Sequence, residues 1–214
     1  MVVDNTFATP VLQRPLALGA DVVIHSTTKF INGHGTVIGG ALVCRDPDFM
    51  ENGGGALVRY IGAVPSAMDC WLTSIGLKTL PLRMREHCAN ARALAEFLDS
   101  NDRVVRTHWP GLETHPQHEI AASQMDDFGA MISIDMGDFD SATRLMDGLS
   151  MCSLAVSLGN VDTLVQHPAS MTHRLMSEED RLAVGITNGM IRISAGIESA
   201  KDIIADFDRA ISGL

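Results

Sequence analysis

The first eighty residues alternate short apolar segments with polar turns, which is the pattern of buried strands joined by connections. Val2–Val3 and Val22–Ile24 are short and β-branched, as buried parallel strands are. Between them, Thr9–Gly19 fits a short helix that stops at a glycine. A turn at Asn32–Gly35 leads into a third predicted strand, Val37–Cys44, which glycines interrupt. This order predicts a βαβ unit of an α/β sheet.

The pattern becomes helical from Ser66 to about Leu98, with a second helical run after Pro81. We therefore place a domain boundary near Leu80–Pro81, which divides the chain into residues 1–80 and residues 81–214. The elements predicted beyond the boundary are strands at 131–134 and 190–194 and helices near 141–149, 177–184 and 200–211. Strands with flanking helices predict a small α+β domain for the second part.

The first predicted domain is incomplete as a fold. Three strands and one crossover are too few for a doubly wound sheet with helices on both faces. The apolar pattern also begins at once, with Val2–Val3. We therefore expect residues 1–80 to be the C-terminal part of a larger domain whose N-terminal part is missing.

Composition excludes several classes of protein. Hydrophobic residues make up 46% and charged residues 20%, which favours a folded domain with a sizeable core. The net charge of −10 and the lack of a basic run argue against nucleic-acid binding. No apolar stretch approaches the roughly 20 residues that span a bilayer, so no membrane segment is expected. The four cysteines are widely spaced, which indicates reduced thiols of a cytoplasmic protein.

Lysine is scarce, and one of the three lysines has a setting that favours chemistry. Lys29 follows the predicted strand Val22–Ile24 and the hydroxyl-rich run Ser26–Thr28, and Asp4 follows Val2–Val3. A lysine, a strand-end carboxylate and a hydroxyl-rich turn are the groups that hold pyridoxal phosphate (PLP). Taken alone, Lys29 fits better as an ordinary surface lysine at the end of a strand, which is the usual fate of lysine.

Five segments, in this order, resemble the PLP-dependent enzymes of Cys/Met metabolism, the transsulfuration family of fold type I. The segments are Val2–Pro10, His25–Phe30, Ser157–Gly159, Pro168–His173 and Ile191–Glu198. The resemblance implies that residues 1–80 end the large, parallel-sheet, PLP-binding domain and that residues 81–214 form the small α+β C-terminal domain. It also implies a homo-oligomer built as a dimer of dimers.

The resemblance assigns site residues. Lys29 is implied to be the Schiff-base lysine and the proton shuttle. The other cofactor-binding residues implied are Asp4 at the pyridine nitrogen, Ser26 and Thr28 at the phosphate, and Thr6 in support. Ser157 and Arg192 are implied to bind the α-carboxylate of the substrate, with Thr172 nearby. Independently, Arg192 lies between two isoleucines, where an unpaired guanidinium costs several kcal/mol and a carboxylate ligand would relieve that cost.

The activity implied is γ-elimination from a small sulfur amino acid, methionine or cystathionine, which gives 2-oxobutyrate, ammonia and a thiol. Val156 and the segment Gln166–Ser170 favour the methionine γ-lyase-like branch of the family. The alternative with the same residues is γ-replacement, as in a cystathionine γ-synthase or a homoserine-ester sulfhydrylase.

Two further alternatives belong to other classes. Family members need a glycine-containing phosphate loop, an aromatic residue on the cofactor ring, and a tyrosine and an arginine from a partner subunit. None of these can be located here, so one alternative is that the chain alone is inactive. An α/β binding module for an anionic ligand is the simpler alternative.

A metal site at His108, His115, His118 and Glu119 is not expected, because these residues lie in a predicted Pro-containing loop and not on a helix face.

Overall fold

The structure, a computed structural model, describes residues 1–214 and has two β-sheets. The smaller sheet has the order β1 (Val2–Asp4), β2 (Val22–Ser26), β3 (Gly40–Cys44). β1 and β2 are parallel, as predicted, and β3 runs antiparallel to β2. β3 is shorter than predicted, because the carbonyl of Gly39 accepts the N–H groups of Thr27 and Thr28 in the turn that follows β2.

The larger sheet has the order β4–β5–β8–β7–β6. Its strands are β4 (Arg106–His108), β5 (Met131–Asp135), β6 (Ser153–Leu154), β7 (Leu164–Gln166) and β8 (Met190–Ser194). All pairs are antiparallel except β6 with β7. β5 and β8 were predicted; the other three strands have only two or three residues each, too few to show a period of two.

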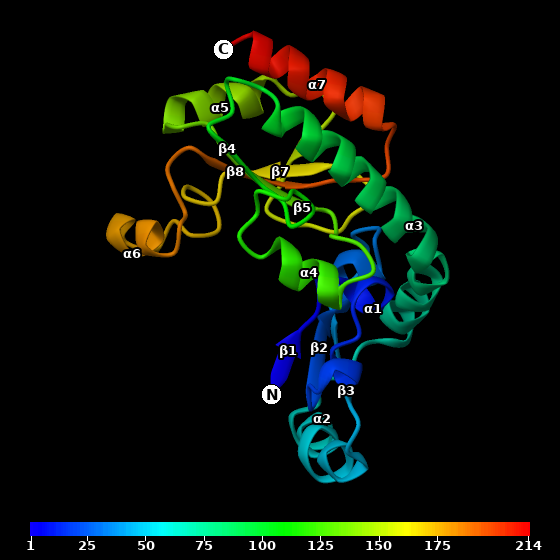
Figure 1. Ribbon diagram of the computed structural model, residues 1–214. Helices are drawn as coiled ribbons and strands as arrows, with labels where there is room; N and C mark the ends of the chain where they lie inside the picture. Colours follow the sequence, from blue (N-terminus) through cyan, green and yellow to red (C-terminus); the bar gives the residue numbers. More distant parts are fainter.

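Three helices cover one face of the larger sheet: α3 (Ala67–Asp99), α5 (Phe139–Gly148) and α7 (Ala200–Ser212) (Figure 1). Isoleucines from β5 and β8 pack against leucines and a phenylalanine of these helices to form the main core. The fully buried members are Ile132, Ile134, Ile191, Ile193, Leu94, Leu98, Leu145 and Phe207. The predicted α+β architecture of the second half is therefore confirmed.

Helix α3 is continuous for 33 residues and contains Pro81. The expectation of a second helical run beginning after Pro81 is therefore wrong. Pro81 lies on the exposed side, whereas Leu80 and Met84 on the other side are buried and hold the helix to the core. α3 contacts both the turn after β2 and the strands β4 and β5. The division into residues 1–80 and 81–214 passes through this helix and stays a prediction.

The first crossover also differs from its prediction. Instead of one helix over Thr9–Gly19, it forms α1 (Thr9–Leu12) and the 3₁₀ helix η1 (Pro15–Leu18). Pro15 disfavours helical backbone at Arg14, whose φ is −124°, so the helix breaks there. The crossover ends, as predicted, at Gly19, which adopts a left-handed φ of +102°.

The remaining helices are short: the π-helical turns η2 (Thr27–Ile31) and η3 (Phe49–Gly54), and α2 (Gly55–Ile61), α4 (His118–Gln124) and α6 (Glu178–Ala183). His118 and Glu119 begin α4, so the loop predicted for them is wrong at these positions. No three His, Cys, Asp or Glu side chains converge into a metal-binding group. None of the helices combines the length and the apolar character that crossing a bilayer requires.

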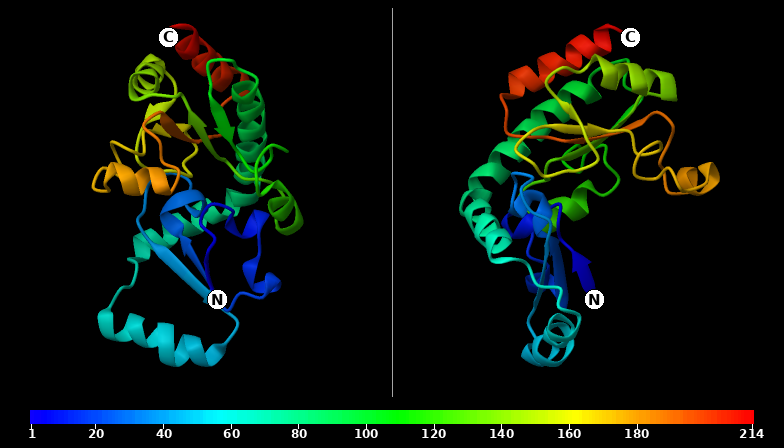
Figure 2. Two further views of the ribbon diagram at one scale, coloured as in Figure 1. Left: turned by 60° about the vertical axis from the view of Figure 1, so that its left-hand side comes forward. Right: turned by 180° about the vertical axis from the view of Figure 1, so that it is seen from behind.

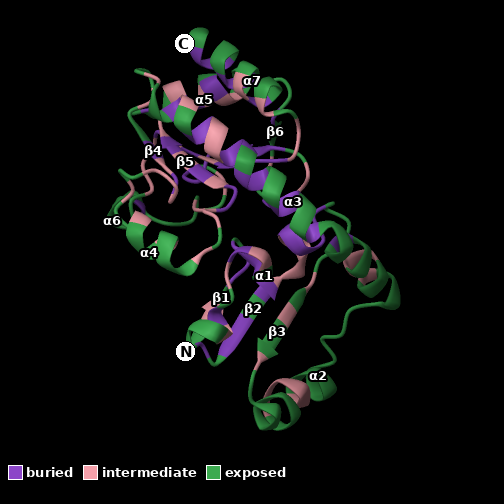
Figure 3. Cartoon of the chain, turned by 45° about the vertical axis from the view of Figure 1, so that its right-hand side comes forward, coloured by how far each residue is buried: buried purple, intermediate pink, exposed green.

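Burial is uneven along the molecule. α2 lies at the end opposite to the C-terminus (Figure 2), and α2 with the first turns of α3 is mostly exposed (Figure 3). β1, predicted to be buried, is an edge strand, and Val2 is 62% exposed. The prediction of burial fails there because no element of the chain covers the outer edge of β1.

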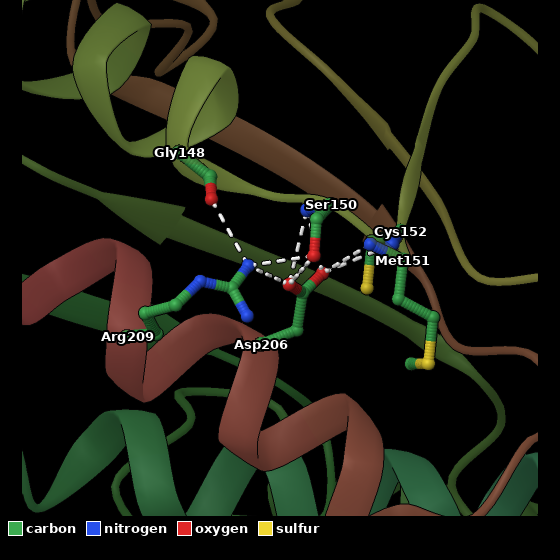
Figure 4. Close-up of polar contacts among 6 residues, drawn as sticks. All are labelled: Gly148, Ser150, Met151, Cys152, Asp206 and Arg209. Atoms are coloured by element: carbon green, nitrogen blue, oxygen red, sulfur yellow. Dashed lines mark hydrogen bonds and ion pairs between the residues drawn. The ribbon is translucent and has the colours of Figure 1, made fainter.

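The loop between α5 and β6 is tied to α7 by one buried carboxylate, Asp206 (Figure 4). Asp206 accepts the backbone N–H groups of residues 150, 151 and 152 at 2.9–3.2 Å and pairs with Arg209. Burial alone would raise the pKa of Asp206, but these hydrogen bonds, led by the one from Cys152, hold it well below its usual range.

We expect Asp206→Asn to lower the free energy of unfolding at neutral pH by about 2–4 kcal/mol, because an amide cannot replace an ionised acceptor of several donors. The contribution of Asp206 is present above its unfolded-state pKa of about 4 and is lost as the pH falls below that value. Urea unfolding of both forms as a function of pH measures it. Asp208→Asn, an exposed neighbour on α7, is the control. Equal stability of Asp206→Asn and wild type would contradict the assignment.

Candidate active site

The site is built around Lys29, in the turn η2 that follows β2. Lys29 interrupts the turn with non-helical dihedral angles, φ −90° and ψ −134°. Because β1 and β2 are parallel, their carboxyl ends meet at one edge of the sheet, which brings Asp4 and Ser26 to the side where Lys29 lies. The predicted grouping of a strand-end carboxylate, a hydroxyl and a lysine is therefore present.

Residues far apart in the sequence meet at the Lys29 amine. Lys29 Nζ donates to Ser157 Oγ at 3.1 Å. Arg192, in the central strand β8, donates from Nη2 to the backbone carbonyls of Ser157 at 2.9 Å and Val156 at 3.2 Å. Arg192 forms no ion pair with a carboxylate of the chain. Lys29, Ser157 and Arg192 therefore form one connected group, in which the guanidinium still has nitrogens available for an anion.

Electrostatics favour a neutral amine at Lys29. Burial is the main cause that lowers the pKa of Lys29, and the positive charge of Arg192 lowers it further. Burial likewise lowers the pKa of Arg192. Since an amine must lose its proton before it can attack a carbonyl carbon, the environment of Lys29 is suited to a nucleophile.

Asp4 is held in its ionised form by Thr6. The hydroxyl and the backbone N–H of Thr6 lower the pKa of Asp4. Burial opposes this lowering in part, and the nearby His25 adds a further, smaller lowering. The Thr6 N–H lies 3.0 Å from Asp4 Oδ1. Thr6 Oγ1 also accepts the backbone N–H of Ser26 at 2.8 Å. Thr6 thus joins the ends of β1 and β2, consistent with the supporting role predicted for it.

A cavity of about 580 Å³ lies beside Lys29. Four of the predicted cofactor-binding residues line it: Asp4, Thr6, Ser26 and Lys29. The opposite wall is largely apolar and comes mostly from the segment that leads into β5. Its members include Pro110, Met125, Phe128, Met131 and Leu158. A carboxylate, a hydroxyl and an amine therefore face one cavity that has an apolar side.

Two predicted residues lie away from this group. The Thr28 hydroxyl is engaged by Gly39, accepting its N–H at 2.9 Å and donating to its carbonyl at 3.3 Å, and Thr28 does not line the cavity. Thr172 is exposed, and its hydroxyl accepts from Gln166 at 3.2 Å. Gln166 pairs with Arg192 across β7 and β8, so Thr172 reaches the neighbour of Arg192 and not Lys29.

Sequence reasoning missed three buried polar residues of α3: Arg83, His87 and Asn90. They lie on one face of the helix and hydrogen-bond to backbone carbonyls beside the site. The available signal was their spacing, because polar side chains three and four residues apart among apolar ones lie on the buried face of a helix.

Gly159 sets the distance between the Ser157 loop and the Lys29 turn. Its φ is +74°, and a Cβ there would lie 2.5 Å from the backbone nitrogen of Phe30. Its N–H donates to Ser194 Oγ at 2.9 Å, which fixes the loop to the end of β8. Any side chain at 159 would therefore push the loop away from Lys29.

We expect Gly159→Ala to lower the free energy of unfolding by about 2–4 kcal/mol, from the left-handed backbone and the clash together. Gly185→Ala is a matched control: Gly185 also has a positive φ, of +80°, but open space around it. It should lose only about 1–2 kcal/mol. Thermal or urea unfolding of the two variants separates the cost of the left-handed backbone from the cost of the clash. Equal losses of unfolding free energy in both variants would contradict a close contact at Gly159.

The family model for "Cys/Met metabolism PLP-dependent enzyme" matches residues 1–212. The chain is 49% identical to an L-methionine gamma-lyase of Fusobacterium nucleatum subsp. polymorphum, over 99% of this chain and 54% of that protein. It is 46% identical to a cystathionine beta-lyase of Lactococcus lactis subsp. cremoris (strain MG1363), over 98% and 55% respectively.

A solved cystathionine gamma synthase of Xanthomonas oryzae pv. oryzae superposes with a TM-score of 0.95 at 48% identity, covering 99% of this chain and 55% of that one. The predicted fold class is therefore confirmed. The chain spans about half the length of the curated relatives it matches.

Proposed function

The chain belongs to the family of Cys/Met metabolism PLP-dependent enzymes, and on this premise we propose that the full-length protein is a carbon–sulfur lyase that acts on methionine or cystathionine. The reaction is γ-elimination, giving 2-oxobutyrate, ammonia and a thiol. The observation that carries the proposal is the connected group of Lys29, Ser157 and Arg192, in which a lysine of lowered pKa lies beside a guanidinium without a carboxylate partner.

The residues around the cavity fit PLP. The Lys29 amine would hold the cofactor aldehyde, the Asp4 carboxylate would pair with the pyridine nitrogen, and the Ser26 hydroxyl would bind a phosphate oxygen. Thr28 is assigned to the phosphate as well, on the family pattern alone. When bound, PLP supplies an aldehyde for amines and a ring that withdraws electrons from the α-carbon.

Each residue of the group has a task in the reaction. With the cofactor bound, Lys29 Nζ would take the proton from the α-carbon of the substrate, and its lowered pKa favours the neutral form that this role needs. Ser157 Oγ holds the amine in place between proton transfers. Arg192 binds the α-carboxylate of the substrate through nitrogens that make no other bond, and Thr172 supports this region through Gln166.

γ-Replacement is the second candidate, because the same residues would serve it and a cystathionine gamma synthase is among the similar structures.

We also propose that the full-length protein is a cytoplasmic homo-oligomer, a dimer of dimers. Large apolar side chains exposed along α2 and the start of α3 support an association surface; they include Leu57, Tyr60, Ile61, Met68 and Trp71.

The test is a substrate panel on the full-length enzyme. Methionine, cystathionine and a homoserine ester are each supplied with and without an added thiol, and 2-oxobutyrate and the amino-acid products are measured. Fast release of 2-oxobutyrate from methionine supports the methionine γ-lyase-like branch. Cystathionine cleaved far faster than methionine would contradict that branch, and product formed only from the ester with thiol would establish γ-replacement.

The chain of residues 1–214 needs a separate test, because an inactive part of a larger enzyme and an anion-binding module remain alternatives. Purified chain is mixed with PLP, reduced with borohydride, and mapped by peptide mass. A label on Lys29 supports a working cofactor site within these residues. Label scattered over Lys78 and Lys201, or none, would mean that this chain alone does not hold the cofactor.

A further inference from the structure

Arg83 is a buried cation without a counter-ion. Its side chain lies on the inner face of α3, the residue is 5% exposed, and it makes no ion pair with a carboxylate. Burial lowers the pKa of Arg83. A buried guanidinium costs free energy unless its donors are satisfied, so its hydrogen-bond acceptors show which part of the structure it stabilises.

Two of the acceptors of Arg83 are backbone oxygens next to Lys29, and the other two, Thr79 Oγ1 and the carbonyl of Gly76, belong to α3 itself. Arg83 Nη1 donates to the carbonyl of Phe30 at 2.6 Å, and Nη2 donates to that of Ile31 at 3.2 Å. These carbonyls end the turn η2, in which the Lys29 carbonyl accepts the N–H of Gly33 at 2.8 Å. Without Arg83, the buried carbonyls of Phe30 and Ile31 would lose these donors.

The surroundings leave room for the guanidinium and for little else. A Cβ on Gly33 would lie 2.1 Å from Arg83 Nη1, and Gly33 has a left-handed φ of +72°. Gly76, one of the other acceptors of Arg83 at 2.8 Å, packs so closely that a Cβ would lie 2.2 Å from the carbonyl oxygen of Asn32. The turn and the helix are thus fitted to each other through Arg83.

The same face of α3 also holds the end of β8. His87 donates from Nδ1 to the carbonyl of Ala195 at 2.7 Å and meets the Phe30 ring edge to face. Burial lowers the pKa of His87 to about 4, so the ring is neutral near pH 7. Asn90 donates to the carbonyls of Gly196 and Glu198 at 3.0 and 2.7 Å. One helix therefore links the Lys29 turn to the strand that carries Arg192.

We propose that Arg83 is a positioning residue for Lys29: its guanidinium holds the carbonyls of Phe30 and Ile31 and thereby keeps the Lys29 amine in its half-buried place against Ser157. Arg83 touches neither Lys29 Nζ nor the cavity, and acts through the backbone alone. The inference rests on the proposed role of Lys29, but it is tested without cofactor or substrate.

The test uses the only three lysines of the chain. Trace labelling with acetic anhydride across about pH 7 to 11, followed by peptide mass analysis, gives a labelling midpoint for Lys29, Lys78 and Lys201 in one sample. Lys78 and Lys201 are exposed and serve as internal references. Arg192 on β8 and Asp4 on β1 are unchanged in every variant. The charge that the Arg83 variants remove is not among the causes that lower the pKa of Lys29, which are burial and Arg192.

In the wild type we expect Lys29 to label with a midpoint below those of the two references. Arg83→Met, which keeps the stem and removes the donors, should move the Lys29 midpoint up toward the midpoints of the two references, because the released turn exposes the amine to water. Asn90→Leu is the matched control: it removes two buried hydrogen bonds from the same helix face and should destabilise the fold without moving the Lys29 midpoint.

A folded Arg83→Met variant with an unchanged Lys29 midpoint would overturn the role of Arg83 alone. A wild type in which all three lysines share one midpoint would overturn both this role and the proposed chemistry of Lys29. If Arg83→Met does not fold, Arg83→Gln, which retains two shorter-reaching donors, replaces it. A shift in the same direction supports the proposal, and an unmoved midpoint contradicts it.

Discussion

A Lys29→Ala variant is expected to show no visible absorption band with PLP and no borohydride-stable label at position 29. In the full-length enzyme, the same change should lower kcat/KM by about 10³-fold or more, because both the covalent hold on the cofactor and the base for the α-proton are lost. The measurement is single-turnover and steady-state kinetics beside the peptide map. The lowered pKa of Lys29 makes it the amine of this chain that is suited to the task.

The control for Lys29 is Lys78→Ala, since Lys78 is an exposed lysine on α3 with no assigned role. This variant should keep the band, the label and the activity. Retained PLP binding without any covalent label in Lys29→Ala, together with no label in the wild type, would favour the anion-binding module. Full activity of Lys29→Ala would refute the assignment of the site.

Arg192→Met should lower kcat/KM of the full-length enzyme by about 10²–10³-fold, mainly through KM, because the charge-assisted hydrogen bonds that we propose to the substrate carboxylate would be removed. Arg192→Lys keeps the positive charge but loses the paired N–H donors of the guanidinium, so an intermediate loss of kcat/KM is expected. Arg192 also holds the carbonyls of Val156 and Ser157, and kcat is therefore expected to fall moderately as the loop beside Lys29 loosens.

Arg103→Met is the comparison for Arg192. Arg103 follows the C-terminal end of α3, donates to the carbonyl of Ile211 and does not line the cavity beside Lys29, so its loss should leave KM unchanged. Labelling with PLP and borohydride separates cofactor binding from substrate binding in both variants. An unchanged KM in Arg192→Met, with Lys29 still labelled, would show that the carboxylate is bound elsewhere.

The site was predictable where its chemistry is local in sequence. Asp4 and Lys29 each follow a short β-branched strand, and the parallel pairing of β1 with β2 then brings both to one edge. The same register predicts the position of Ser26. The position of the Thr28 side chain was not predictable, because it hydrogen-bonds to Gly39 instead of lining the cavity, and turn geometry, not residue type, sets that direction.

Contacts between residues far apart in the sequence could not be predicted from the pattern of hydrophobic and polar positions. Lys29 and Ser157 are 128 positions apart, and their hydrogen bond depends on the packing of Gly159 against Phe30. The spacing of Arg83 along the helix could have indicated a buried face, but its contact with the Lys29 turn depends on the path of the whole helix. The break expected at Pro81 failed for a related reason: buried Leu80 and Met84 outweigh the missing N–H of proline.

The family, the fold class and the residue types of the candidate site could be predicted from the amino-acid sequence, because they depend on hydrophobic period and on motifs of a few neighbouring residues. Which of those residues meet depends on tertiary packing. The fold joins Lys29 to Ser157 and Arg192, keeps Thr28 and Thr172 away from the Lys29 amine, and places an unexpected arginine, Arg83, behind the Lys29 turn. Burial and hydrogen-bond satisfaction are properties of packed elements, so two residues 128 positions apart share no local signal.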